Sequence, residues 1–185
     1  MRVFGEDRAD ERLARYHEIE PGLQTGGARS YREVMTETMR ELGAPDQEVS
    51  GLAKALPSWE PFPEVRSSLE DARARGWKLA ILSNTDRDFI EASMKQIGVP
   101  FELAIVASEI GSYKPALGHW RTFEQEVGRL PDVHVAASLF HDIGPANELG
   151  LASIWINRLA ETAGPRSTRE QPDLRGLADR LEEVA

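Results

Sequence analysis

The chain has 185 residues and a formal net charge of −9 at pH 7, from 31 acidic and 22 basic residues. At about 150 residues per domain, this length predicts one globular unit, and an apolar fraction of 41% argues against global disorder. The acidic balance argues against a nucleic-acid partner, because phosphates require clustered Lys and Arg, but a small anionic substrate needs only a local positive site. The absence of cysteine excludes disulfides, thiolate chemistry and cysteine zinc sites.

Neither the N-terminus nor any later segment resembles a targeting or membrane sequence. The first residues lack the apolar stretch of a signal peptide, and no run approaches the roughly 20 apolar residues of a membrane span. We therefore expect a cytoplasmic protein without a membrane partner.

The first sixty residues have helical periodicity and contain no convincing strand. Ser30 and Glu33 form a capping-box pattern ahead of an apolar stripe that ends at Gly43. A second stripe covers residues 49–56, and an earlier helix is expected to end before Pro21. This part of the chain therefore predicts a small helical unit.

A proline-rich segment, Pro57–Pro63, separates this unit from the rest of the chain. Its three prolines cannot lie inside a helix or a central strand, so we place a domain boundary there and expect a helical domain over 1–60 and a core over 61–185.

The core alternates between helix and strand. Helices are predicted at about 64–75, 87–97, 116–127 and 174–181, with a short one ending at Gly150, and strands at 78–82, 103–107, 133–139 and 153–156. This alternation is typical of an α/β fold whose parallel sheet is covered by helices. The polar stretch 161–171 is predicted to be a mobile loop.

Polar residues follow three of the predicted strands, where ligands collect in open parallel sheets. Ser83 and Asn84 end the first strand, Lys114 lies in the loop after the second, and Asp142 lies in a sharply turning loop after the third. Each has an ordinary structural explanation, namely a turn or helix cap, a solvated lysine and a helix cap. The three together, in this order and spacing, favour a functional site.

These motifs resemble the haloacid dehalogenase (HAD) superfamily over roughly residues 5–185. The matching segments are Leu82–Thr85, Tyr113–Pro115 and Val135–Leu151, and the nearest branch is that of the type II haloacid dehalogenase-like hydrolases. The resemblance implies a Rossmann-like parallel sheet with a small helical cap, which residues 1–60 would form.

The resemblance also implies a mechanism and roles for the matching residues. Hydrolysis would proceed through a covalent intermediate on an aspartate, with a small anionic organic compound as substrate. Ser83 would hold a substrate oxygen, and Asn84 and Tyr113 would contribute to the substrate site. Lys114 would pair with the nucleophilic carboxylate, and Asp142 would position Lys114 and water.

The sequence departs from the family in its first motif, an apolar strand followed by Asp-x-x-Gly-Thr, which is absent. Val3–Asp7 is too short and mismatched to replace it. We therefore expect the first strand to be missing from the middle of the sheet, between the strand ending at Ser83 and the strand at 133–139. A truncated gene model or a real loss would produce this sequence, and either predicts an inactive chain whose exposed strand edges favour a homodimer or self-association.

The second departure concerns metal binding. Superfamily phosphatases usually have an acid five residues before the last aspartate, where this chain has Ala137, so Asp142 is the remaining carboxylate for Mg²⁺. We therefore expect no metal and favour a dehalogenase, although the asparagine of that branch is replaced by Leu139. The alternatives are an Mg²⁺-dependent HAD phosphatase and a non-catalytic remnant or interaction module.

Other chemically interesting residues are interpreted as structural. His17, His119 and His134 show no ligand spacing, whereas His141 must lie near the site because it precedes Asp142. Trp59, at the hinge between the two units, is the one tryptophan expected to line a pocket.

Overall fold

The computed structural model describes residues 8–162 and 164–185; the segment Val3–Asp7 lies outside this described part. The α-helices are α1 Ala9–Gln24, α2 Tyr31–Glu41, α3 Gly51–Ala55, α4 Val65–Ala74, α5 Arg87–Ile97, α6 Ala107–Ile110, α7 Gly118–Val127, α8 Gly144–Glu148 and α9 Leu177–Val184. The strands are β1 Ala80–Ser83, β2 Leu103–Val106, β3 Val133–Ala136, β4 Ala152–Ile156 and β5 Arg169–Gln171. None of the helices in the described ranges is long and apolar enough to cross a membrane.

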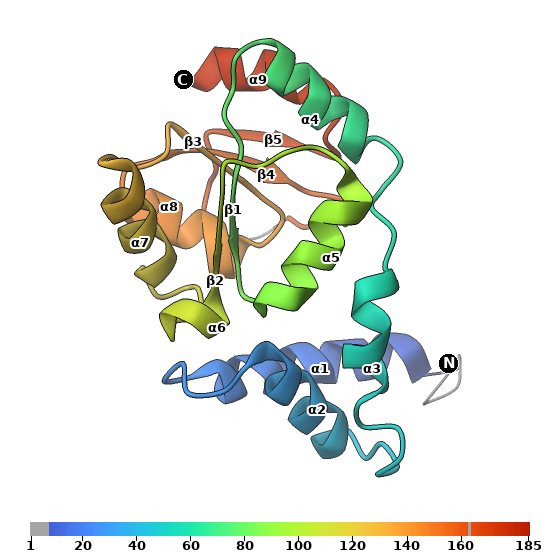
Figure 1. The fold of residues 1–185 in the computed structure, drawn as a ribbon. Coiled ribbons are helices and arrows are strands. Elements are labelled where there is room, and N and C mark those ends of the chain that lie inside the picture. The colour runs from blue at the N-terminus through green and yellow to red at the C-terminus, as the bar shows by residue number, and fades with distance from the viewer. Residues whose placement is uncertain (1–7, 163) are drawn as a thin grey trace.

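The strands form two parallel sheets, in the order β1-β2 and β3-β4-β5. Helices connect β1 to β2 and β3 to β4, which confirms the predicted α/β architecture. Figure 1 shows α1, α2 and α3 gathered below the strands, with α4 and α9 side by side at the opposite end.

The sheet is interrupted between β1 and β3. In the described part of the chain β1 is hydrogen-bonded to β2, and β3 to β4, but β1 and β3 belong to different sheets. This break between β1 and β3 lies where the sequence analysis expects a strand to be missing. The facing edges of β1 and β3 thus have no strand partner among the described residues.

The main core lies on β4 and its covering helices. Ile154 and Ile156 of β4 pack with Leu177 and Leu181 of α9, and all four are at most 5% exposed. Burying such aliphatic side chains stabilises a fold by about 1.5–3 kcal/mol each. This cluster holds α4 and α9 against the three-stranded sheet.

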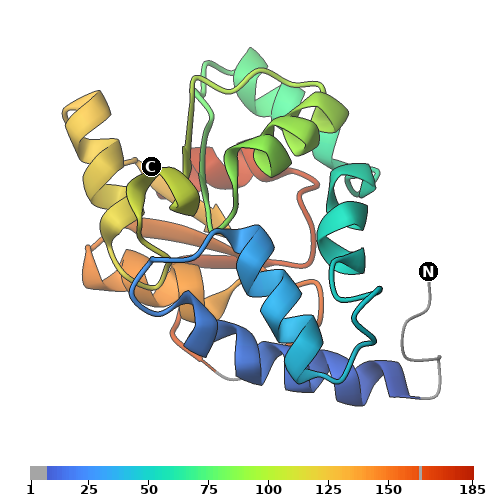
Figure 2. The ribbon, with the colours of Figure 1, turned by 60° about the horizontal axis from the view of Figure 1, so that its bottom comes forward.

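The helical unit has its own smaller core and no strand within residues 8–60. Ile19 of α1 packs there with Met39 of α2 and with Val49. Helix α2 begins with the predicted capping box, in which Ser30 and Glu33 each accept a hydrogen bond from the other's backbone N–H. Figure 2 shows α1 and α2 lying side by side along this unit.

Helix α1 is longer than predicted. It continues through Pro21 to Gln24, because a proline near a helix end removes only one backbone hydrogen bond, and one further turn still packs against α2. The extra turn brings Gln24 onto the same helical face as Glu20, four residues earlier.

Two predictions in the C-terminal half are wrong. Strand β3 stops at Ala136 instead of continuing to 139, since Leu139–Ile143 forms a π-helical turn in which the Ser138 hydroxyl accepts a hydrogen bond from the His141 backbone N–H. The stretch 161–171 is not all loop, because Arg169–Gln171 forms β5 beside β4. The other predicted elements from residue 64 onward are confirmed to within three residues at each end.

Candidate functional site

A cavity of about 370 Å³ lies where the carboxyl ends of β1 and β3 meet the helical unit. The strand ends and the loops after them contribute polar side chains: Ser83, Asn84, Lys114, His141 and Asp142. The opposite wall comes from the helical unit and includes Glu20, Gln24, Tyr31 and the expected Trp59. The cavity thus contains four of the five site residues predicted from sequence.

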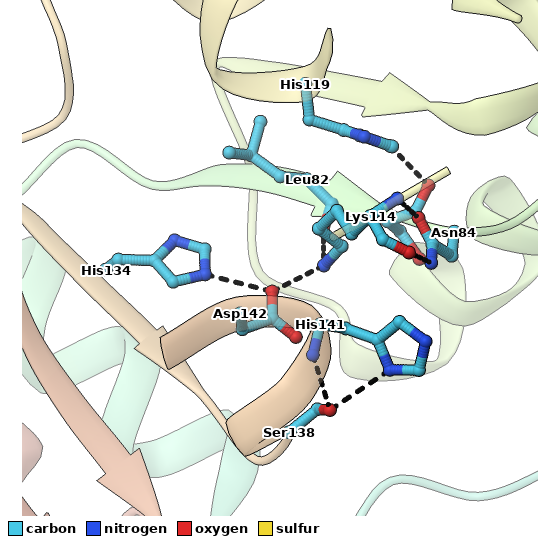
Figure 3. A network of polar contacts seen from close by, with 9 residues as sticks. Leu82, Asn84, Lys114, His119, His134, Ser138, His141 and Asp142 are labelled. Atoms are coloured by element: carbon cyan, nitrogen blue, oxygen red, sulfur yellow. Dashed lines mark hydrogen bonds and ion pairs between the residues drawn. The ribbon is translucent and has the colours of Figure 1, made fainter. Parts of the chain in front are cut away.

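Lys114 and Asp142 form the buried ion pair of this cavity. The Lys114 Nζ atom donates to Asp142 Oδ1 at 2.6 Å and to the Leu82 carbonyl oxygen at 2.8 Å, as Figure 3 shows. Lys114 is 7% exposed and Asp142 6%. Because Leu82 belongs to β1 and Asp142 follows β3, this ammonium group links the two sheets across the break.

His134 is a second partner of Asp142. Its Nε2 atom lies 3.0 Å from the same Oδ1, and both side chains are buried. Burial alone would raise the pKa of Asp142, but the hydrogen bond from His134 and the charge of Lys114 outweigh it and lower the pKa to about 2. Asp142 is therefore a carboxylate at neutral pH, and His134, which sequence reasoning treats as merely structural, helps to fix it.

Asn84 holds the backbone of Lys114 in place. Its Nδ2 donates to the Lys114 carbonyl at 3.0 Å, and its Oδ1 accepts from the Lys114 N–H at 2.7 Å. This reciprocal pair joins the loop after β1 to the loop after β2. Through it, Asn84 orients the lysine that the sequence places at the centre of the site.

Ser83 and Tyr113 differ in their availability to a ligand. Ser83 lines the cavity, and its hydroxyl has no hydrogen-bond partner in the described part of the chain. Tyr113 is absent from the lining residues; its hydroxyl donates to the Arg29 carbonyl at 3.0 Å, and its ring packs on Val34 and Ala107. In this structure Tyr113 therefore joins the helical unit to the core.

His119 contacts the end of β1. It is fully buried, and its Nε2 lies 3.0 Å from the Ser83 carbonyl oxygen. Burial lowers the pKa of His119 to about 4, so the ring is neutral at pH 7 and must carry its proton on Nε2 to donate to this carbonyl.

His141 contributes a buried nitrogen to the cavity wall. The Ser138 hydroxyl oxygen accepts from the His141 backbone N–H at 3.1 Å and lies 3.1 Å from its Nδ1. When this hydroxyl donates to Nδ1, the ring proton is on Nε2, which is buried without a partner among the described residues. Burial lowers the pKa of His141, which favours this neutral form.

The described residues do not fit Mg²⁺. No group of three or more His, Asp or Glu side chains in residues 8–162 and 164–185 lies close enough to hold a metal ion. Asp142 Oδ1 is shared by Lys114 and His134, whereas Mg²⁺ requires several oxygen ligands in octahedral geometry.

Asp86, just after this site, attaches the helical unit to the core. Its two carboxylate oxygens accept from the backbone N–H groups of Tyr31 at 2.7 Å and Arg32 at 2.9 Å, in the first turn of α2. A carboxylate at a helix N-terminus satisfies free N–H groups and complements the helix dipole. The position of α2 is thereby tied to the loop that carries Ser83.

Sequence reasoning missed the contribution of α1 to the cavity. Glu20 and Gln24 are 8% and 6% exposed although their residue types usually face solvent. The available signal was their placement four residues apart beside the apolar Ile19 and Leu23, which mark the buried side of α1.

Comparison with known proteins finds consistent similarity. The family model described as haloacid dehalogenase-like hydrolase matches residues 4–137. A phosphoserine phosphatase of Thermus thermophilus is 28% identical over 94% of this chain and 72% of its own length. An (S)-2-haloacid dehalogenase of Pseudomonas sp. strain YL is 31% identical over 74% of this chain and 61% of its own length. The structure of L-2-haloacid dehalogenase from Xanthobacter autotrophicus with covalently bound chloropropionic acid superposes with a TM-score of 0.79 at 20% identity, covering 97% of this chain and 89% of that one.

Proposed function

We propose that this chain, which belongs to the haloacid dehalogenase-like hydrolase family, carries the substrate-anion site of a dehalogenase acting on a small organic acid. The observation that supports this most directly is the buried ammonium group of Lys114, held in the cavity wall by Leu82 and Asp142. An ammonium group has three N–H donors, and Leu82 and Asp142 accept from two of them, so one donor remains for an anion in the cavity.

The free hydroxyl of Ser83 complements this charge. Both groups line the same cavity, so a substrate carboxylate there would accept a hydrogen bond from Ser83 and pair with Lys114. Apolar side chains from Leu56, Trp59 and Phe89 line the remainder and fit the carbon skeleton of a small acid.

Turnover requires a nucleophile beside Lys114. Asp142 and Glu20 are the carboxylates of the described cavity lining, and Asp142 is held by Lys114 and His134. In the proposed reaction a further aspartate attacks the carbon that bears the halogen, and halide leaves. Water then hydrolyses the resulting ester, which gives the hydroxy acid and restores the carboxylate. We expect the described residues alone to bind the acid without hydrolysing it.

A phosphatase is the second candidate, supported by the similarity to the Thermus thermophilus phosphoserine phosphatase over 94% of this chain. The dehalogenase is favoured by the somewhat higher identity of the (S)-2-haloacid dehalogenase of Pseudomonas sp. strain YL, 31% against 28%.

Calorimetric titration with (S)-2-chloropropionate tests the binding site. The wild type should bind it, Lys114→Met should abolish binding, and Lys78→Met, which removes an exposed lysine, should leave it unchanged. No binding by the wild type would contradict the proposal and favour a non-catalytic module.

Turnover is tested by extending the chain at its N-terminus with an apolar strand ending in Asp-x-x-Gly-Thr. Halide release from chloropropionate by the extended chain, without Mg²⁺, is the expected result. Hydrolysis of p-nitrophenyl phosphate only with Mg²⁺ would support the phosphatase instead.

A further inference from the structure

The helical unit places a carboxylate in the cavity, facing the loops that carry Lys114. Glu20 is on α1, is 8% exposed, and lines the same cavity as Ser83 and Lys114. Its Oε1 atom accepts hydrogen bonds from the hydroxyls of Tyr16 at 3.1 Å and Tyr31 at 3.0 Å. The two tyrosines fix this carboxylate on the cavity side of α1.

Glu20 makes no ion pair with any of the described residues. Every hydrogen bond that its side chain makes within residues 8–162 and 164–185 comes from a neutral tyrosine hydroxyl and ends on one oxygen. Burial and the Glu20 charge both raise the pKa of Tyr16 and of Tyr31, so these hydroxyls stay protonated and remain donors. A buried carboxylate is costly unless a cation pairs with it, and none of the residues in 8–162 and 164–185 provides one.

Gln24 extends the same polar surface. It lies one helical turn after Glu20, is 6% exposed and lines the cavity. No hydrogen bond of its side-chain amide is formed within the described part of the chain. Glu20 and Gln24 thus present a carboxylate and an amide oxygen to the cavity, and both can accept from a positively charged donor.

We propose that Glu20 and Gln24 form an ammonium-binding subsite, so that the substrate is a small organic acid or ester that also carries a protonated amine. Its anionic group would occupy the Lys114 end of the cavity, and its amine the Glu20 end. A plain haloacid would leave the Glu20 charge unpaired. This inference rests on the proposed function, because it assumes that an anion binds at Lys114.

The test compares matched ligands with and without an amine. One pair is 2-amino-3-chloropropionate and 3-chloropropionate; the other is 2-aminoethyl phosphate and ethyl phosphate. We expect the amine-bearing member of whichever pair binds to have a Kd about tenfold lower in calorimetric titrations at pH 7, which corresponds to about 1.4 kcal/mol.

Variants of α1 identify the source of the preference. In Glu20→Gln the Kd values of the two members of a pair should lie within about twofold of each other. Lys114→Met should weaken the binding of both members. Gln24→Lys introduces an ammonium group four residues after Glu20, a favourable helical pairing, and should also remove the preference. Glu18→Gln is the matched control, because Glu18 is exposed and pairs with Arg15 on the same helix.

The outcomes separate the two proposals. Equal affinities within both pairs, with binding still dependent on Lys114, would overturn the ammonium subsite and leave the anion site intact. A preference that survives in both Glu20→Gln and Gln24→Lys would also overturn it. Binding of (S)-2-chloropropionate but of none of the four ligands would overturn the subsite alone. Failure of (S)-2-chloropropionate and of all four ligands to bind would overturn the proposed function, and the subsite with it.

Discussion

The Lys114 ammonium and the Asp142 carboxylate lie 2.6 Å apart although the two residues follow strands of different sheets. In an uninterrupted sheet, backbone hydrogen bonds between neighbouring strands would hold these loops together. Here a buried charge pair joins them, and its loss should affect folding as well as ligand binding.

Breaking this pair should destabilise the protein strongly. Asp142→Asn or Lys114→Met should each lower the free energy of unfolding by about 3–5 kcal/mol, because each leaves a buried charge uncompensated. The double variant Lys114→Met/Asp142→Asn should lower the free energy of unfolding by less than the sum of the two single effects. Urea denaturation measures these values, with Arg129→Ala, which removes an exposed pair with Asp132, as a control expected to cost at most about 1 kcal/mol. Additive effects in the double variant would contradict a coupled pair.

His119 should make stability depend on pH. Its pKa is about 4 in the folded protein and 6.5 in the unfolded chain, so protons bind preferentially to the unfolded state between these values. Its contribution is complete above pH 6.5 and is lost, by about 1.4 kcal/mol per pH unit, as the pH falls towards 4. His119→Gln should reduce the difference between the free energies of unfolding at pH 7.5 and pH 4.5, both measured by urea denaturation. His17→Gln, which replaces an exposed histidine, serves as the control and should leave this difference unchanged.

The break between β1 and β3 should make the chain prone to self-association. Each unpaired N–H or C=O that is also shielded from water costs about 1–3 kcal/mol, and strand edges readily pair with other chains. Sedimentation of the 185-residue chain should show dimers or larger species. Fusing an apolar strand to its N-terminus should raise the melting temperature and favour the monomer. A stable monomer that the fusion leaves unchanged would show that these edges need no partner.

Magnesium should have little effect on the 185-residue chain. A ligand that binds only the folded state raises the melting temperature with concentration, and the described residues provide too few oxygen ligands to hold Mg²⁺. Thermal melts with 0 and about 5 mM MgCl₂ should therefore coincide. A shift that Asp142→Asn abolishes would place a metal at this site and strengthen the phosphatase candidate.

Local sequence signals were sufficient for most helices and strands. The Ser30–Glu33 capping box is a short-range interaction, and the apolar run before Ser83 forms a half-buried strand that pairs in parallel with β2. Strand β5 has no such signal, because Arg169 and Glu170 are exposed and the strand exists only by pairing with β4.

The site was partly predictable for a similar reason. The pairing of Lys114 and Asp142 follows from their places after parallel strands, and it is confirmed. The roles of His134 beside Asp142 and of Glu20 in the cavity depend on long-range packing that periodicity does not report. Tyr113 follows the motif, yet its hydroxyl reaches Arg29 instead of the cavity.

The hydrogen bonds from α2 to Asp86 constrain how the helical unit could move. Both carboxylate oxygens hold the first turn of α2, whereas the far end of that helix, at Glu41, has no such attachment to Asp86. A rotation that preserves these bonds must have its pivot at Tyr31 and Arg32. The largest displacement would then fall on the end of the helical unit remote from Ser83, so a substrate could be exchanged while the loop that binds its anion keeps its shape.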